Sequence, residues 1–299
     1  MHNFDAIVIG QGYAGLSAAK LIAAQGLRAA NFESECMGGL IVNVNELDPA
    51  PPDSPHSGAE LASALALSNV EQGVSSVSDA VVAVSRVDGS WGVRTESDSY
   101  LARRVVVASG ARLRKLGVPG EEEFFGQGVS ECADCDGPLF QGMETVVVGA
   151  GDSAFQEALT LSQFASKVTM LIRGSAPRAR RDMLERAAAD PKIVQLRHTT
   201  VTAILGTPGT GVDGVRVINE GTGEKSIPCA GVFVFIGLAP NTAFLPESLS
   251  RDASGALITS DQCATDLPGL WAIGAVRSGF GGTLKDAEAD ARQVAAALR

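Results

Sequence analysis

Short apolar runs recur along the chain, and each is typical of a strand buried in a parallel sheet. The first, residues 6–9, leads into a glycine-rich turn and then an alanine-rich helical stretch that extends to about residue 24. Gly26 follows this stretch, as a glycine often follows the end of a helix. A second strand is predicted at 29–33, so the chain opens with a strand–turn–helix–strand unit.

A second unit with the same pattern begins near residue 145. An apolar strand at 145–148 precedes a glycine-rich turn at 149–154, a helix at 155–164 and a further strand at 168–172. Strands that alternate with helices in this way predict parallel sheets. The sequence therefore predicts an α/β fold with two Rossmann-like dinucleotide-binding domains, and the likeness of the two units indicates duplication.

The remaining pattern predicts the elements that accompany these two units. Residues 48–58 contain four prolines and are expected to form a loop. The other predicted elements are a helix at 59–72, an antiparallel meander at 80–86, 91–95 and 99–103, a buried strand at 104–108, alternating segments from about residue 200 that end in a buried strand at 232–236, a strand at 270–273 and a helix at 285–298.

Composition narrows the class of protein. The 299 residues suggest about two domains, and 45% hydrophobic residues with 19% charged residues are typical of a compact globular protein. The formal charge is 24 − 34 = −10 and aromatic residues make up 5%, whereas nucleic-acid-binding proteins usually present a basic face with interleaved aromatics. No apolar run reaches the roughly 18 residues of a membrane span, and no signal peptide is visible. We therefore expect a cytoplasmic protein without nucleic-acid or membrane partners.

The first glycine-rich turn has the spacing of a dinucleotide-binding motif. Gly10, Gly12 and Gly15 lie between a strand and a helix, and Glu33 follows Gly10 by 23 residues. Such glycines let a pyrophosphate approach the N-terminus of the helix, and the carboxylate then accepts hydrogen bonds from a ribose. The alternative is an ordinary strand–helix connection followed by a surface glutamate.

The second glycine-rich turn differs from the first in the charged residues that follow it. Gly149 and Gly151 are followed by Ala154 at the third position, which the motif permits. The position 23 residues beyond Gly149 is Ile172, so no acid stands there. Four arginines follow instead, and their planar donors suit a 2′-phosphate, which favours NADPH over NADH. The alternative is a solvated basic helix start. These arginines are Arg173, Arg178, Arg180 and Arg181.

A cysteine pair lies between the two glycine-rich turns. Cys132 and Cys135 are separated by two residues and can cycle between dithiol and disulfide, which transfers two electrons. Asp136 follows directly and is positioned in the sequence to donate or accept a proton. A zinc site is the alternative, but the three histidines show no ligand spacing. The remaining cysteines, expected to be core or surface thiols, are Cys36, Cys229 and Cys263.

Several segments together resemble the low-molecular-weight thioredoxin reductases. The resemblance covers essentially the whole chain and implies that FAD occupies a discontinuous domain, 1–113 with 241–299, into which an NAD(P)H-binding domain, 114–240, is inserted. It also implies a homodimer whose domains rotate during turnover, and thioredoxin or a similar dithiol protein as substrate. The segments that carry it are residues 107–111, 131–137 with Gly120 upstream, 149–154, 237–242 and 269–274.

The resemblance also implies roles for individual residues. Cys135 would lie against the flavin, Cys132 would attack the substrate disulfide, and Asp136 would serve as the acid. The helix that begins near Leu284 would direct its positive end at the flavin pyrimidine. The residues expected to bind FAD or NADPH are Gly10, Gly12, Gly15, Glu33, Gly38, Gly39, Gly110, Gly149, Gly151, Asp152, Ser153, Arg173, Arg178, Gly274 and Leu284.

The chain departs from the pattern of the family in four places, two of them single residues and two of them short segments. Ala275 replaces an aspartate that bonds the FAD ribityl chain, and Leu40 replaces a glutamine after Gly38 and Gly39. Residues 282–284 replace Arg-Gln-Ala, and 172–174 replace the His-Arg-Arg phosphate motif. These losses indicate altered flavin binding or an altered electron donor. The alternatives are a dithiol oxidase that passes electrons to oxygen, a reductase supplied by a donor such as ferredoxin, and a nucleotide-binding redox sensor.

Overall fold

The computed structural model describes residues 2–44, 46–47, 51 and 55–298. Two compact units divide the chain: unit 1 comprises Met1–Arg112 and Ala239–Arg299, and unit 2 comprises Leu113–Leu238. The chain passes between the units at β7 (Ala111–Leu113) and β16 (Leu238–Pro240), which form a two-stranded sheet. Unit 2 is thus inserted into unit 1 along the chain.

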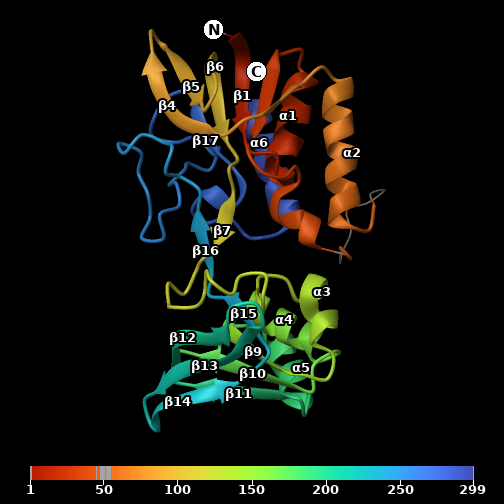
Figure 1. Cartoon of the computed structure of the whole chain (residues 1–299). Coiled ribbons are helices and arrows are strands. Elements are labelled where there is room, and N and C mark those ends of the chain that lie inside the picture. Colours follow the sequence, from red (N-terminus) through yellow and green to blue (C-terminus); the bar gives the residue numbers. More distant parts are fainter. Residues whose placement is uncertain (1, 45, 48–50, 52–54, 299) are drawn as a thin grey trace. The chain divides into compact units, whose positions relative to one another are not determined.

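Unit 1 contains a seven-stranded sheet with the order β3-β2-β1-β6-β5-β4, in which β17 also pairs with β6 (Figure 1). Strand β1 lies parallel to both of its neighbours. Its residue Ile7 is paired with Ala30 of β2 and with Val105 of β6. The bounds are β1 (His2–Ile9), β2 (Ala29–Glu33), β3 (Ser75–Ser78), β4 (Val81–Val87), β5 (Ser90–Thr95), β6 (Ser99–Val107) and β17 (Leu270–Ala272).

Alternate residues of β1 and β6 enter different apolar clusters, which explains why their apolar runs are continuous. Val8 and Val106 pack with residues of α1 (Tyr13–Ala23) and α6 (Leu284–Ala297). Ile7 and Val105 pack with Trp91, Val93 and other residues of the second cluster. The remaining elements of unit 1 are η1 (Gly39–Asn43), α2 (Gly58–Glu71) and η3 (Gly274–Val276).

Unit 2 combines a five-stranded parallel sheet, β11-β10-β9-β15-β8, with a three-stranded antiparallel sheet, β12-β13-β14 (Figure 1). In β9, Val147 packs with the helices, whereas Val146 and Val148 pack against residues of the antiparallel sheet. The strands are β8 (Val129–Ser130), β9 (Glu144–Gly149), β10 (Lys167–Ile172), β11 (Ile193–Arg197), β12 (Thr199–Thr207), β13 (Gly211–Asn219), β14 (Gly223–Pro228) and β15 (Gly231–Phe235), and the helices are α3 (Ala133–Asp136), η2 (Gly137–Phe140), α4 (Asp152–Leu161) and α5 (Arg181–Ala189).

Two predicted elements differ from the structure. The segments 99–103 and 104–108 form one strand, β6, because its first part pairs with β5 and its last part with β17. The helix predicted at 155–164 begins at Asp152, directly after the glycine-rich turn, and ends at Leu161. Of the proline-rich loop predicted at 48–58, residues 48–50 and 52–54 lie outside the described part of the chain.

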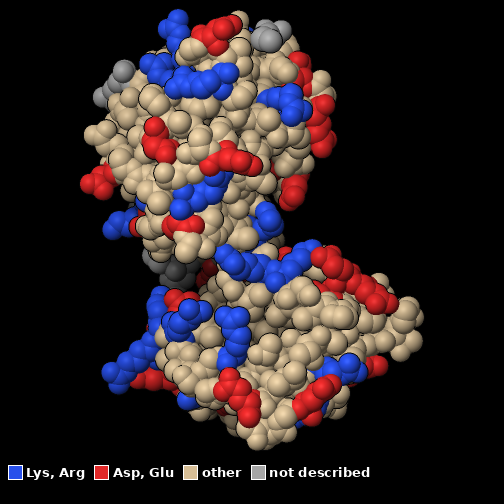
Figure 2. Space-filling view, turned by 90° about the vertical axis from the view of Figure 1, so that its left-hand side faces the viewer, with Lys and Arg blue, Asp and Glu red and all other residues tan. Residues whose placement is uncertain are grey.

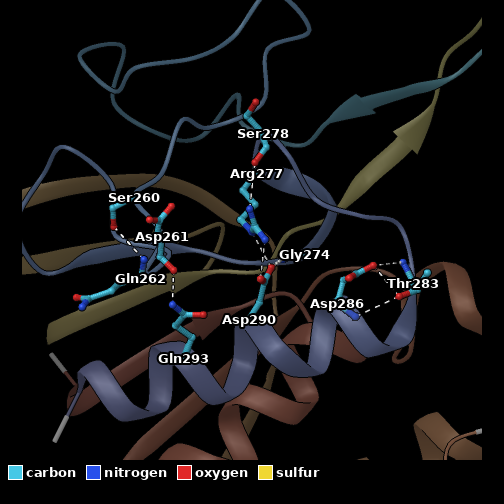
Figure 3. Close-up of polar contacts among 10 residues, drawn as sticks. All are labelled: Ser260, Asp261, Gln262, Gly274, Arg277, Ser278, Thr283, Asp286, Asp290 and Gln293. Carbon is cyan, nitrogen blue, oxygen red and sulfur yellow. Dashed lines mark hydrogen bonds and ion pairs between the residues drawn. The ribbon is translucent and has the colours of Figure 1, made fainter.

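A buried ion pair ties α6 to the turn that follows β17 (Figure 3). Asp290 is 4% exposed, and its Oδ2 accepts hydrogen bonds from the Gly274 amide at 2.9 Å and from Arg277 Nε at 2.7 Å. Oδ1 accepts a second bond from Arg277 Nη2 at 2.7 Å. Since the carboxylate meets both the guanidinium and a backbone amide, its buried charge is compensated.

We expect Asp290→Ala to lower the free energy of unfolding by about 3 kcal/mol, because it leaves the half-buried Arg277 guanidinium and the Gly274 amide without their partner. Urea unfolding monitored by circular dichroism measures this. Asp286→Ala is the control on the same helix, since it removes an exposed capping carboxylate and should cost about 1 kcal/mol. Equal losses in the two variants would contradict this account of the buried pair.

Candidate active site

The cysteine pair forms a disulfide at the start of α3. The Sγ atoms of Cys132 and Cys135 are bonded, and their Cα atoms are 5.3 Å apart. Cys132 occupies the N-cap position, and its Sγ accepts a hydrogen bond from the Cys135 amide at 3.1 Å. Cys135 is exposed, while Cys132 is half-buried. The site thus presents a disulfide to solvent on a short, backbone-defined turn.

Asp136 ends α3, and its amide donates to the Cys132 carbonyl oxygen at 3.1 Å. It is half-buried and directly follows the exposed Cys135. The next element, η2, is anchored by Phe140, whose ring meets that of Phe233 edge-on at 5.4 Å between centroids. The C-terminal side of the cysteine segment is therefore held by unit 2 itself.

Glu157 of α4 also contacts this segment, and the sequence-based interpretation did not include it. Its Oε2 accepts a hydrogen bond from the Ala133 amide, the first amide after Cys132, at 2.7 Å. Burial raises the pKa of Glu157, the nearby charge of Asp134 raises it further, and the Ala133 hydrogen bond opposes both. A signal was present, because position 157 places a carboxylate on the same helical stripe as Ala154 and Leu161, which are buried.

A second carboxyl group with a raised pKa, Glu131, directly precedes Cys132. Its burial is the main cause, and the charges of Glu121 and Glu122 act in the same direction. The nearby Lys115 opposes the shift. Glu131 precedes Cys132, and Glu157 binds the amide that follows it. Both carboxyl groups have a raised pKa and take up a proton more readily than an ordinary glutamate.

The first glycine-rich turn requires glycine for two close backbone contacts. A Cβ on Gly10, whose φ is +108°, would lie 2.2 Å from the Ala108 carbonyl oxygen, and a Cβ on Gly15 would lie 2.0 Å from the Gly10 oxygen. Gly12 is the N-cap of α1, and no side chain caps this helix. The amides of the first turn of α1 are therefore not covered by a capping side chain.

Glu33 lies at the end of β2 beside this turn. Its Oε2 accepts a hydrogen bond from the Gln11 amide at 2.9 Å, and its Oε1 accepts from the amides of Ser34 and Glu35 at 2.9 and 3.0 Å. Gly38 also joins the turn, since its amide donates to the Gln11 carbonyl oxygen at 2.7 Å and Gly39 follows it. These contacts orient the Glu33 carboxylate through the backbone.

Other predicted cofactor residues of unit 1 reach the same region. A Cβ on Gly274 would lie 3.0 Å from Ala14 Cβ, near the start of α1. Leu284 packs in a cluster that contains Tyr13, also in the first turn of α1. Gly110 follows β6, and its carbonyl oxygen accepts from the Asn241 amide at 3.0 Å.

The N-terminus of α6 carries its own anionic cap (Figure 3). Thr283 Oγ1 accepts a hydrogen bond from the Asp286 amide at 3.2 Å, and Asp286 Oδ2 accepts from the Thr283 amide and hydroxyl at 3.1 and 2.6 Å. These bonds hold the pKa of Asp286 below its usual range. The helix that was expected to face the flavin therefore carries the carboxylate of Asp286 in its first turn.

The second glycine-rich turn is also built by a close contact. A Cβ on Gly149 would lie 2.3 Å from the Phe235 carbonyl oxygen, whereas a Cβ on Gly151 would meet nothing within 4 Å. Gly151 is the N-cap of α4, no side chain caps this helix, and Asp152 and Ser153 are exposed in its first turn. The approach to these amides is open on the Gly151 side.

Two arginines of the basic cluster are brought to this turn by their backbone. The Arg178 amide donates to the Ala150 carbonyl oxygen at 2.7 Å, and the Arg180 amide donates to Asp152 Oδ1 at 2.7 Å. Arg180 pairs with Asp182 at 3.2 Å, and Arg181, which begins α5, pairs with Glu185 at 2.8 Å. Arg180 and Arg181 therefore form the basic helix start that was the alternative interpretation.

Arg173 and Arg178 differ from the other two arginines of the cluster. Both are exposed, and neither has an ion-pair partner within 4.0 Å among the residues of the described segments. Lys, Arg, Asp and Glu side chains are interspersed over the face of the molecule in Figure 2. An arginine without a carboxylate partner on such an acidic protein has its donors free for an anion.

The other three cysteines are free thiols. Cys36 is exposed, whereas Cys229 and Cys263 are buried. Burial is the main cause that raises the pKa of both buried thiols to about 12. Among the described residues, no group of three or more His, Cys, Asp or Glu side chains is arranged to hold a metal ion. In the same residues, no helix combines the length and apolar character needed to cross a membrane.

Comparison with known proteins identifies the family. Residues 4–297 match the pyridine nucleotide-disulphide oxidoreductase family, so the chain belongs to it and is a disulfide oxidoreductase. It is 37% identical over 278 residues to the thioredoxin reductase of Treponema pallidum, covering 92% of this chain and 90% of that protein. The Bacillus subtilis thioredoxin reductase is 35% identical over 277 residues, covering 92% and 87%.

Solved structures agree with these relatives. A thioredoxin reductase structure from Lactococcus lactis matches with a TM-score of 0.91 and 32% identity, covering 99% of this chain and 97% of that one. The structure of T. acidophilum thioredoxin reductase matches with a TM-score of 0.89 and 30% identity, covering 100% and 98%. The predicted resemblance and the α/β fold with two Rossmann-like domains are confirmed.

The burial of the cysteines predicts their reactivity. In the folded, oxidised protein, iodoacetamide at neutral pH should label Cys36 and leave Cys229 and Cys263 unmodified, because a buried thiol with a pKa of about 12 forms almost no accessible thiolate. Mass spectrometry of the digested protein identifies each site. Denaturation before labelling is the control and should expose all three. Labelling of either buried cysteine in the folded state would contradict the prediction.

Proposed function

We propose that this protein passes electrons from NADPH through FAD and the Cys132–Cys135 pair to the disulfide of thioredoxin or a similar dithiol protein. The observation that carries the proposal is the solvent-facing disulfide of α3 in a chain that matches thioredoxin reductases over 92% of its length. We further propose a homodimer located in the cytoplasm. Two exposed apolar residues of α2, Leu67 and Val70, support a second copy as the covering partner.

The geometry of unit 1 fits FAD. Glycine at position 10 allows the tight turn, the uncapped first turn of α1 offers amides to a pyrophosphate, and Glu33 offers a carboxylate held by three backbone amides. We therefore assign FAD to unit 1, with Gly38, Gly39, Gly110, Gly274 and Leu284 contributing around it. Ala275 and Leu40 supply no polar group, so the flavin depends more heavily on the backbone contacts.

Unit 2 fits NADPH on similar grounds. The uncapped first turn of α4, with Gly151 open before it, offers amides to a pyrophosphate. Arg178 is tied to this turn through Ala150, and its guanidinium has no carboxylate partner among the described residues. We assign the 2′-phosphate to Arg178 and Arg173, and the pyrophosphate to the turn that contains Gly149, Gly151, Asp152 and Ser153.

The cysteines and Asp136 supply the chemistry of the chain itself. FAD held beside the first glycine-rich turn and Glu33 would supply an electron pair, received as hydride from NADPH, for reduction of the disulfide. Breaking the Cys132–Cys135 bond leaves two sulfurs that need one or two protons, and Asp136 is the proposed donor. Cys132 then attacks the substrate disulfide, and Cys135 resolves the mixed disulfide, so that the Cys132–Cys135 bond forms again and the substrate leaves as a dithiol.

The surface beside the disulfide suits a protein substrate. Leu139, three residues beyond α3, is 71% exposed, and Pro138 next to it is also exposed. A large exposed apolar side chain close to a reactive group indicates a contact point for a partner. This supports a protein disulfide rather than a small thiol as the substrate.

Anaerobic titration of the flavin tests the electron donor. We expect NADPH to reduce the flavin at lower concentration than NADH, and the Cys132→Ser variant to retain this reduction while losing turnover with thioredoxin. The visible absorbance of the flavin reports its reduction. If dithionite and dithiols reduce the flavin but NADPH does not, the protein is instead a dithiol oxidase or a reductase with another donor, and consumption of oxygen with a dithiol separates these two.

The arginine assignment has its own test. Removing a charge-assisted hydrogen bond costs about 1.5–3 kcal/mol, so Arg178→Ala should raise the KM for NADPH by about 10- to 150-fold and leave the KM for NADH unchanged. Steady-state kinetics with both cofactors measure this. Arg181→Ala is the matched control, because Arg181 is paired with Glu185 at 2.8 Å. An equal effect on NADPH and NADH would refute the 2′-phosphate assignment.

A further inference from the structure

Glu157 connects the cysteine segment to the helix of the second dinucleotide-binding motif. Its Oε2 accepts the hydrogen bond of the Ala133 amide at 2.7 Å, and this amide directly follows Cys132. Glu157 lies on α4, the helix whose N-terminus follows the second glycine-rich turn. One carboxylate therefore links the nucleophilic cysteine to the helix that begins at the proposed NADPH site.

The surroundings of Glu157 make its charge significant. The side chain is half-buried on a stripe of α4 that otherwise packs into the apolar core through Ala154, Ala158 and Leu161. The elements packed against α4 are α3, α5, β9, β10 and β15. Among their described residues, Asp134 of α3 is the charged group that acts on Glu157, and it is also negative. No described cation therefore neutralises this carboxylate.

A negative charge at this position changes the chemistry of Cys132. In the oxidised protein, Cys132 is uncharged and the Ala133 amide is bound to Glu157. After reduction, a Cys132 thiolate places a second negative charge one residue from that amide, and like charges disfavour ionisation. A thiol with a higher pKa forms a less stable thiolate, which makes its disulfide harder to reduce and the dithiol a stronger reductant.

We propose that Glu157 is a positioning residue for the dithiol: it ties the backbone after Cys132 to α4 and holds a negative charge there that keeps the Cys132/Cys135 pair strongly reducing. This inference deepens the proposed function, since it rests on Cys132 as the cysteine that attacks the substrate. Such a pair transfers its electrons readily to the disulfide of a partner. The tether and the charge are separable by substitution.

Two variants separate the tether of Glu157 from its charge. Glu157→Gln keeps an oxygen that accepts the Ala133 hydrogen bond but removes the charge, whereas Glu157→Ala removes both. Asp134→Asn is the matched control, because it removes an exposed negative charge from α3 without removing the bond to Ala133. The purified full-length protein is equilibrated in dithiothreitol redox buffers without NADPH, and mass spectrometry after thiol trapping gives the oxidised fraction of the pair.

For Glu157→Gln we expect the equilibrium to shift toward the dithiol by about tenfold, which corresponds to a potential higher by about 30 mV. The pKa of Cys132, measured from the pH dependence of its alkylation after reduction, should fall with it. Glu157→Ala should show the same shift in potential together with faster alkylation of Cys135 through loss of order in α3. Asp134→Asn, whose charge is exposed to solvent, should shift the equilibrium by less than threefold.

The proposal is overturned if Glu157→Gln leaves the potential and the pKa of Cys132 unchanged, or if Asp134→Asn shifts them equally. Should neither Glu157 variant fold, the potential of the unmodified protein between about pH 5 and about pH 9 decides the question. The slope of that dependence becomes shallower above the pKa of the first thiol, so a change of slope well below the usual thiol pKa of about 8.5 would overturn the proposal. Failure of NADPH to reduce the flavin would reject the proposed function without touching this result, since these measurements use no NADPH.

Discussion

Both units depend on the close approach of a glycine to a carbonyl oxygen of the neighbouring parallel strand. Gly10 meets the Ala108 oxygen just beyond β6, and Gly149 meets the Phe235 oxygen at the end of β15. Any side chain at either glycine would force the strand apart from its neighbour. Because the contact holds the turn tightly against the sheet, each following helix begins directly beyond the strand with its first amides uncapped. These two turns are the sites at which we propose that the anionic cofactors bind.

Electrostatics then distinguishes the two turns. Beside the first, the backbone orients the Glu33 carboxylate, which suits the hydroxyl groups of a ribose. Beside the second, a loop tied to Ala150 carries arginines, two of which are neutralised by carboxylates of their own helix. Arg173 and Arg178 lack such partners in the described chain. The two turns therefore share one geometry and have opposite charge beside them.

Much of the fold could be predicted because its central parallel strands are buried on both faces and read as apolar runs. The strand 29–33 coincides with β2, and the helix predicted at 285–298 lies within one residue of α6 at each end. The boundary between 103 and 104 was wrong, since pairing partners on two different strands, rather than any local signal, make β6 continuous. Long-range pairing of this kind leaves no mark in hydrophobic periodicity.

By itself the sequence determined the chemistry: the two glycine-rich turns, Glu33, the Cys132/Cys135 pair with Asp136, and an arginine cluster on an acidic chain. The tertiary structure decided which arginines are already paired, that Thr283 and Asp286 cap α6 with a carboxylate, and that Glu157 binds the amide after Cys132. The physical reason is the separation along the sequence over which each kind of signal acts. Residue type and spacing act within a few residues, whereas a hydrogen bond across 24 residues forms only when packing brings the donor and the acceptor within 2.7 Å of each other.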